Sequence, residues 1–292
     1  MDLMTTAEVA DYLRLKERTV YEMASRQQIP CTRATGKLLF SRKLIERWVE
    51  GRTDLPLGYD AAAAPIYAGS SDPLLEWALR ESGCGLALLT SGSRDGLERL
   101  ARGEALLAGL HLKDPNGEGY NVETIRREIP FPDVVAIRFA ERAQGLLVAP
   151  GNPLGIGELD DLARRRPRLL LRPEGTGSRS LFDALTEAQG LNAGELNLLS
   201  GEAQTEGDLA TLIAEGEADC GLGIAAAARR HGLDFVPLGV QESFDLVMRR
   251  RDYFEPPIQR LLALLASAAF RRRAESHGGY DLTRQGQVTY NG

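Results

Sequence analysis

The sequence predicts an α/β protein with a small, mainly helical N-terminal part and a larger body. In the first fifty residues, apolar residues recur at helical spacing, and one hairpin signal interrupts them. From residue 66 onward, short apolar runs alternate with helical patterns, which is typical of a largely parallel sheet. The 292 residues suffice for two or three compact domains. We expect a first domain at 1–52, a connector at 53–65 and a body at 66–292 that divides into two lobes.

Composition excludes several classes of protein. Hydrophobic residues make up 43% and charged residues 26% of the chain, as in ordinary globular proteins. No apolar run approaches the roughly 20 residues that cross a bilayer, and the N-terminus lacks the pattern of a signal peptide, so we expect a cytoplasmic protein without a membrane partner. The three cysteines and three histidines are scattered without zinc-ligand or redox-pair spacing, so no metal site and no cofactor is predicted.

The first 52 residues predict three helices and a hairpin. TTAEVADYL opens with a capping box, Thr5 to Glu8, and spaces four apolar residues for a short helix: Ala7, Val9, Ala10 and Leu13. After a tight turn, ERTVYEMASRQQ predicts a second helix. IPCTRATGKLLFS contains two strand-like runs that join at Thr35-Gly36, and RKLIERWVEG predicts a third helix that Ser41 caps. Two short helices, a hairpin and a helix make a winged helix-turn-helix.

Residues 3–50 resemble the excisionase and MerR-type DNA-binding domains, through TTAEVADYL, ERTVYEMASRQQIP and the Gly36 wing. The resemblance implies that the second helix enters the major groove of double-stranded DNA. The residues expected to contact DNA are Lys16, Arg18, Thr19, Tyr21, Glu22 and Arg26 from the second helix, with Arg33 and Lys37 from the wing. A solvated charged face or a protein-binding module is the alternative.

Charge is distributed unevenly along the chain. Residues 1–52 carry ten Lys/Arg and seven Asp/Glu, whereas the remainder carries 25 Lys/Arg and 34 Asp/Glu. Only the first part is therefore expected to meet a polyanion. Because one module of this size buries too little surface for tight specific binding, we also expect a homodimer on two half-sites.

Small hydroxyl residues follow three of the predicted strands, in AGSSDP, LTSGSRDG and EGTGSRS. Each segment precedes a helical pattern, so free N–H groups and partial positive charge lie at the carboxyl end of a strand, where open α/β sheets bind ligands. The glycines lack the Lys of a P-loop and the third glycine of a dinucleotide fingerprint. A helix cap is the alternative at any one position, with Thr176 or Ser178 as the cap in the third segment. For the set we expect an anion site formed by Ser70, Ser71, Ser91, Ser93, Thr176, Gly177 and Ser178.

Residues 66–289 resemble the PBP-like domain, a relative of type 2 periplasmic binding proteins. The likeness rests on SGSRDGLERLARGEALLAGLHLKDPNGEGYN, GLLVAPGNPLGIGELDDLARRRPRLLLRPEGTGSRSLFDAL, EGEADCGLGIAAAA and GGYDLTRQGQV. It implies a two-lobed body of the type 2 periplasmic-binding-protein kind and a small oxyanion as effector, molybdate or tungstate, because the fold is shared with proteins that bind these ions. Neutral hydroxyl and N–H donors suit such an anion.

Arg94 and Arg179 lie beside the serines and could clamp a carboxylate instead, which keeps an organic acid or amino acid open as the ligand. His111, Tyr120 and Asn121 could line the cleft, with a buried structural role as the alternative for His111. No nucleophile–base pair or cofactor fingerprint is visible, so the chain is not expected to be an enzyme. The sequence thus predicts a transcriptional regulator that binds operator DNA and responds to a small anion; a DNA-bound scaffold with a vestigial pocket is a further alternative.

Overall fold

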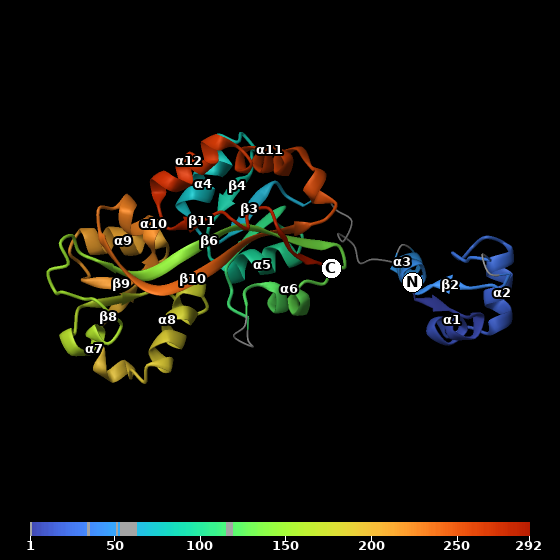
Figure 1. Ribbon diagram of the computed structural model, residues 1–292, viewed down its shortest axis with the longest axis horizontal. Helices are drawn as coiled ribbons and strands as arrows, with labels where there is room; N and C mark the ends of the chain where they lie inside the picture. The colour runs from blue at the N-terminus through green and yellow to red at the C-terminus, as the bar shows by residue number, and fades with distance from the viewer. Residues whose placement is uncertain (1, 34–35, 51, 53–62, 115–118) are drawn as a thin grey trace. The chain divides into compact units, whose positions relative to one another are not determined.

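The computed structural model describes residues 2–33, 36–50, 52, 63–114 and 119–292 (Figure 1). It divides into two compact units, Met1–Asp60 and Ala61–Gly292, and each is described by itself below. The predicted connector at 53–65 lies outside the described residues except for its last three positions. Among the described residues, no helix has the length and apolar character needed to cross a membrane.

The first unit contains the predicted helices in the predicted order. Its elements are β1 (Leu3–Met4), α1 (Thr6–Leu13), α2 (Glu17–Ser25), β2 (Phe40–Ser41) and α3 (Arg42–Glu50). The capping box is confirmed, because the N–H of Glu8 donates to Thr5 Oγ1 at 3.3 Å and the N–H of Thr5 donates to Glu8 Oε2 at 2.7 Å. Arg14, with a φ of 54°, ends α1 and turns the chain toward α2. One small core joins these elements: Met4, Val9, Ala10, Val20, Ala24, Ile29, Phe40 and Ile45.

Two details of this unit differ from the sequence prediction. Ala7 is exposed and Thr6 is buried. Thr6 precedes Val9 by three positions and Ala10 by four, so the three residues share the buried face of α1. The expected hairpin is described only by the backbone bridge between Thr32 and Leu39, at 2.7 and 2.9 Å, since residues 34–35 lie outside the described part. Phe40–Ser41 instead pairs with Leu3–Met4.

The second unit is built on one curled sheet, which confirms the predicted α/β class. In lobe 1, β3 (Ile66–Gly69) lies parallel to β4 (Ala87–Leu89) and β5 (Leu107–Leu110). In lobe 2, β7 (Leu169–Leu171) lies parallel to β8 (Leu198–Glu202) and β9 (Cys220–Ile224). Two long antiparallel strands, β6 (Val134–Val148) and β10 (Asp234–Arg249), run through both lobes and connect them.

Helices cover both faces of each lobe (Figure 1). In lobe 1, α4 (Pro73–Glu81), α11 (Pro256–Leu265) and α12 (Ala268–His277) pack on one face, with α5 (Ser93–Ala101) and α6 (Val122–Glu128) on the other. In lobe 2, α7 (Asp161–Arg165) and α8 (Gly177–Ala188) lie opposite α9 (Glu206–Ala214) and α10 (Ala225–Arg230). Short 3-10 helices span Ala193–Glu195 and Asp252–Phe254, and β11 (Tyr280–Asp281) and β12 (Val288–Asn291) pair with β6.

Candidate functional site

The three predicted strand-to-helix junctions are present and border the cleft between the lobes. β3 leads to α4, β4 to α5 and β7 to α8. A cavity of about 360 Å³ lies between the last two of these junctions, lined by Thr90, Ser91, Gly92, Arg94, Pro173, Glu174, Gly175, Thr176 and Gln204. A methyl group placed on Gly92 would lie 4.0 Å from Thr176 Cγ2. The N-termini of α5 and α8 therefore face each other across the cleft.

These two helix starts differ in how they are capped. Thr176 caps α8, because its Oγ1 accepts the N–H of Arg179 at 3.3 Å. The cap alternative is thus correct for Thr176, while Ser178 lies inside the helix. Gly92 precedes α5 and offers no side-chain cap. Among the described residues, no side chain caps the first N–H groups of α5.

Ser70 and Ser93 form a buried pair in lobe 1. Their hydroxyl oxygens lie 2.8 Å apart, and Ser93 Oγ also accepts the N–H of His111 at 3.0 Å. Two hydroxyl hydrogens are available and the pair uses one of them. Among the described residues the other has no acceptor, so the pair retains one donor for a ligand.

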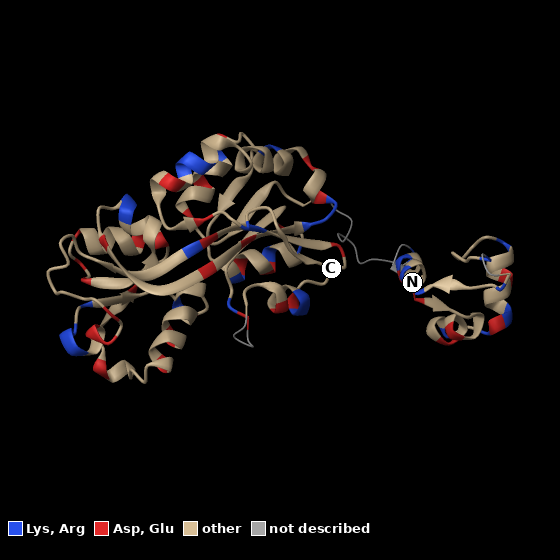
Figure 2. Cartoon of the chain, in the orientation of Figure 1, with Lys and Arg blue, Asp and Glu red and all other residues tan. Residues whose placement is uncertain are grey.

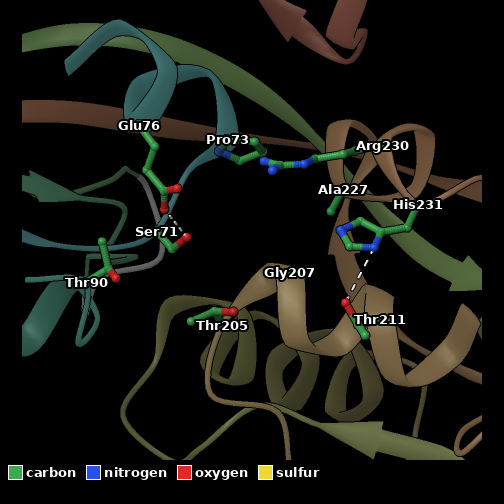
Figure 3. A pocket seen from close by; sticks show the side chains of 10 residues that line it. All are labelled: Ser71, Pro73, Glu76, Thr90, Thr205, Gly207, Thr211, Ala227, Arg230 and His231. Carbon is green, nitrogen blue, oxygen red and sulfur yellow. Dashed lines mark hydrogen bonds between the residues drawn. The ribbon is translucent and has the colours of Figure 1, made fainter. Parts of the chain in front are cut away.

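Beside this cavity is a second one, of about 270 Å³ (Figure 3). Thr90 lines both cavities, so they are adjoining parts of one cleft. From lobe 1 its wall includes Ser71, whose hydroxyl donates to Glu76 Oε1 at 2.6 Å. Its lobe 2 wall comes from α9 and α10 and their flanking residues, namely Thr205, Gly207, Thr211, Ala227, Arg230 and His231.

Lobe 2 contributes a buried carboxylate beside the predicted serine. Ser178 donates to Glu206 Oε1 at 2.6 Å, and Glu206 is only 4% exposed. Its second oxygen has no partner among the described residues. Because a carboxylate already accepts the Ser178 hydroxyl, this serine is less suited to an anion than the Ser70–Ser93 pair.

A buried ionic network lies where the paired strands β6 and β10 pass from one lobe to the other. Glu242 accepts from Arg142 Nε, His111 Nδ1 and Gln144 Nε2, each at 2.8 Å. Arg142 also reaches Asp72, which caps α4 by accepting the N–H groups of Leu74 and Leu75. Burial alone would raise the pKa of Glu242, but Arg142 and His111 outweigh it and lower the pKa to about 2. His111 therefore holds the network together at the edge of the cleft.

The remaining predicted ligand residues already have partners or lie elsewhere, and of these only Arg94 lines the first cavity. Arg94 pairs with Glu128 at 2.6 Å and Arg179 with Asp183 at 3.0 Å, so both guanidinium groups already have carboxylate partners. Asn121 is buried and donates to Asp245 at 2.8 Å. Tyr120 lines a separate groove of about 730 Å³, and burial raises the pKa of its phenol to about 12.

A contact between the two lobes brings some of the predicted ligand-binding residues together. A methyl group on Gly177 would collide with His111 Nδ1, so the start of α8 packs directly on lobe 1. The structure thus links Ser70, Ser93, His111 and Gly177 in one buried group beside the cleft, places Ser178 against Glu206, and leaves Ser91 exposed where it lines the first cavity. Sequence reasoning missed Arg142 and Glu242, because charged residues on long strands give no periodic signal that distinguishes burial from exposure. It also missed Glu206, because an acidic residue in the first turn of a helix is ordinarily an exposed partner of the helix dipole.

The predicted DNA-contacting residues form an exposed face of the first unit. Lys16, Tyr21, Glu22, Arg26, Arg33 and Lys37 are exposed, and Thr19 is half-buried. The Arg18 side chain is 90% exposed and pairs with Glu22 at 3.0 Å. An exposed pair of this kind breaks at little cost, so Arg18 is available to a DNA partner.

Comparison with known proteins agrees with this two-part organisation. A family model described as the PBP superfamily domain matches residues 76–266, which is more than half of the chain, and a helix-turn-helix domain model matches residues 3–53. The chain belongs to the PBP superfamily and carries a helix-turn-helix domain ahead of its PBP domain. This is the architecture of a ligand-responsive transcriptional regulator.

Individual relatives extend the comparison. The chain is 23% identical to the uncharacterized protein YvgK of Bacillus subtilis (strain 168), over 97% of this chain and 96% of that protein. It is similar in structure to a candidate phosphate ABC transporter substrate-binding protein from Clostridium perfringens with bound phosphate, at a TM-score of 0.53 and 13% identity, over 74% of this chain and 97% of that one. An H2O2-bound mutant of Corynebacterium glutamicum OxyR gives a TM-score of 0.51 at 14% identity, over 94% and 90% of the two chains. At these identities the structural likeness concerns the fold alone.

Proposed function

We propose that this protein is a transcriptional regulator that binds operator DNA through α2 and the segment around Thr32–Leu39, and senses a small oxyanion, molybdate or tungstate, in the cleft between its lobes. The observation that carries the proposal is the unused donor of the Ser70–Ser93 pair, beside the uncapped start of α5. Neutral hydroxyl and N–H donors at a helix N-terminus stabilise an anion without a charged side chain. The phosphate-bound neighbour of the same fold is compatible with this reading.

The two cleft arginines favour an oxyanion over a carboxylate. A carboxylate is usually clamped bidentately by a free guanidinium. Arg94 and Arg179 already pair with Glu128 and Asp183, at 2.6 and 3.0 Å. A carboxylate ligand would have to displace one of these partly exposed partners, at a small cost, whereas an oxyanion at the serine pair would not.

Calorimetry on the full chain tests the site. Molybdate, tungstate and sulfate are titrated into the wild type, into Ser93→Ala and into Ser180→Ala, a control at an exposed position of α8. Loss of a hydrogen bond to a charged group weakens binding by about 1.5–3 kcal/mol, so Ser93→Ala should lower affinity by about tenfold or more. Ser180→Ala should bind as the wild type does. Binding of a carboxylate but of none of the three oxyanions would replace the proposed effector, and an unchanged affinity in Ser93→Ala would move the site elsewhere.

Signal transfer is proposed to need two copies of the chain. Ligand favours whichever lobe arrangement binds it better, and it can shift the equilibrium only by that difference in affinity. In a homodimer, lobe closure would alter the spacing of two α2 helices on half-sites about 34 Å apart. Sedimentation of the full chain with and without operator DNA tests the dimer, and a monomer on DNA would contradict it.

A further inference from the structure

Arg230 lines the cavity shown in Figure 3, and further basic residues of α10 and α12 accompany it outside the cavity. These basic residues are Arg229 and Arg230 at the end of α10 and Arg273 and His277 of α12, which we call the arginine seam. α10 belongs to lobe 2 and α12 to lobe 1, and the two helices pack together. The seam therefore spans both lobes.

The seam is centred on His277, whose pKa is affected by Arg273, Arg230 and Arg229, and single contacts locate each arginine. A methyl group on Gly278, the residue after His277, would lie 3.0 Å from a terminal nitrogen of Arg229. Arg273 lies over the Trp77 ring, 5.5 Å from its centre. Arg230 extends across the mouth of the cavity toward Pro73 of lobe 1 (Figure 3).

These guanidinium groups lack counter-charges. Arg229, Arg230 and Arg273 have no carboxylate within 4.0 Å among the described residues, although arginines elsewhere in the second unit, such as Arg94 and Arg168, are paired. Residues 53–292 carry 34 Asp/Glu against 25 Lys/Arg, so acidic partners are abundant. Figure 2 shows basic residues, in blue, on both α10 and α12, with acidic residues, in red, near them. Unpaired arginines side by side repel each other, and a bound anion would remove that cost.

The arginines of the seam lower the pKa values of the two neighbouring histidines, His277 and His231. Burial lowers the pKa of His277, and Arg273, Arg230 and Arg229 lower it further, although Asp72 raises it in part. Burial also lowers the pKa of His231, with a second contribution from Arg230. His277 Nδ1 is buried and has no hydrogen-bond partner among the described residues. The seam thus combines uncompensated charge with an unused polar atom.

The adjoining cavity offers neutral groups to the same ligand. Thr205, Thr211 and Ser71 line it together with Arg230 and His231. Thr211 Oγ1 and His231 Nδ1 form a long hydrogen bond of 3.5 Å, which a ligand could replace at little cost. Guanidinium groups with hydroxyls nearby recognise a tetrahedral, doubly charged anion.

We propose that the arginine seam is a second anion site, which binds a phosphate group, either free phosphate or the phosphate of a small organic phosphate. This goes beyond the oxyanion site at Ser70 and Ser93 and uses different residues. Because Arg229 and Arg230 belong to lobe 2 and Arg273 to lobe 1, the bound phosphate links the lobes and stabilises their closed arrangement. The excess of acidic residues over residues 53–292 favours a small ligand over a DNA backbone.

Calorimetry on the full chain tests the seam, with inorganic phosphate and glucose 6-phosphate as the two probes. Arg230→Gln combined with Arg273→Gln should weaken binding of the tighter probe at least tenfold. The matched control is Arg102→Gln, an exposed arginine of lobe 1 that pairs with Glu98, and it should bind as the wild type does. Tighter binding of glucose 6-phosphate would identify the phosphate as part of an organic molecule, and equal affinities would identify free phosphate; both results support the site.

Ser93→Ala separates the seam from the proposed oxyanion site. Phosphate binding should survive this substitution, and its loss there with retention in the double arginine variant would overturn the proposal. Absence of binding by both probes would also overturn it. If the double arginine variant binds operator DNA with lower affinity than the wild type in the absence of any effector, the seam is a DNA contact and the proposal is overturned. None of these results depends on whether molybdate or tungstate binds the cleft.

Discussion

Replacement of Glu242 by glutamine should destabilise the second unit more than any exposed ion-pair substitution. Glu242 is 1% exposed and accepts from Arg142, His111 and Gln144, so Glu242→Gln leaves Arg142 buried with Asp72 as its remaining carboxylate. Breaking one side of a buried ion pair costs about 3–5 kcal/mol. The lowered pKa of Glu242, from 4.5 to about 2, corresponds to a contribution on the order of 3 kcal/mol. We therefore expect a loss of about 3 kcal/mol in the free energy of unfolding.

Urea unfolding, followed by Trp77 fluorescence in a Trp48→Phe background, measures this loss in the second unit alone, because the chain has two tryptophans. With an m-value of about 3 kcal/mol/M, the midpoint should fall by about 1 M. Glu98→Gln is the control, since Glu98 pairs with Arg102 at 3.5 Å on the surface and should cost at most about 1 kcal/mol. Equal midpoints for Glu242→Gln and the control would refute the structural role of the network.

The same variant gives a pH signature. Because the pKa of Glu242 is lower in the folded state than in the unfolded one, its contribution is present above the ordinary pKa of 4.5 and is lost as the pH falls toward about 2. The stability gap between wild type and Glu242→Gln should therefore stay constant at about pH 5–7 and narrow below pH 4.5. A gap that widens on acidification would contradict the sign of this argument.

Two further predictions concern the cleft and the DNA face. Gly177→Ala should open the lobes or weaken effector binding, because its methyl group would lie 2.8 Å from the His111 backbone oxygen. We expect the free energy of unfolding, measured by thermal unfolding, to fall by about 1–3 kcal/mol. Gly194→Ala, with open space around the added methyl group, is the control and should change stability by about 0.5 kcal/mol or less. Equal effects at both glycines would argue against lobe contact at Gly177. Arg18→Ala and Lys37→Ala should each weaken operator binding in a gel shift, by about 1–3 kcal/mol for Arg18 if it reads a base edge. Unchanged affinity in both would remove DNA binding from this face.

Features that depend on neighbouring residues could be predicted from the sequence, whereas long-range pairing could not. The capping box at Thr5 and Glu8 and the helix start at Asp72-Pro73 are local patterns, and the structure contains both. The apolar runs QGLLVAP and DFVPLGV indicate short strands, but each is only one end of a longer strand, the 15-residue β6 and the 16-residue β10. Charged residues such as Arg142 and Glu242 interrupt the apolar pattern of the rest of each strand. Only the fold shows that Arg142 and Glu242 form a buried ion pair on the neighbouring strands β6 and β10.

In the cleft, too, the local pattern could be predicted from the sequence but the long-range partners could not. Hydroxyls after strands indicated where helices would begin near a ligand site, because strand ends meet at one edge of a sheet. The sequence did not show that Arg94 and Arg179 would pair with Glu128 and Asp183, or that His111 would bond to Glu242, a residue 131 positions away. Such partners follow from tertiary packing.

The central claim is that one chain couples anion sensing to DNA binding, and reciprocal titration tests it most directly. Operator DNA is first selected from random duplexes with the purified full chain. The dissociation constant of that duplex is then measured with and without molybdate, and that of molybdate with and without the duplex. We expect both constants to change by the same factor, about 5–150-fold, which corresponds to a coupling of about 1–3 kcal/mol. Equal affinities in the presence and absence of the second ligand would contradict the account and leave a DNA-binding protein with an uncoupled cleft.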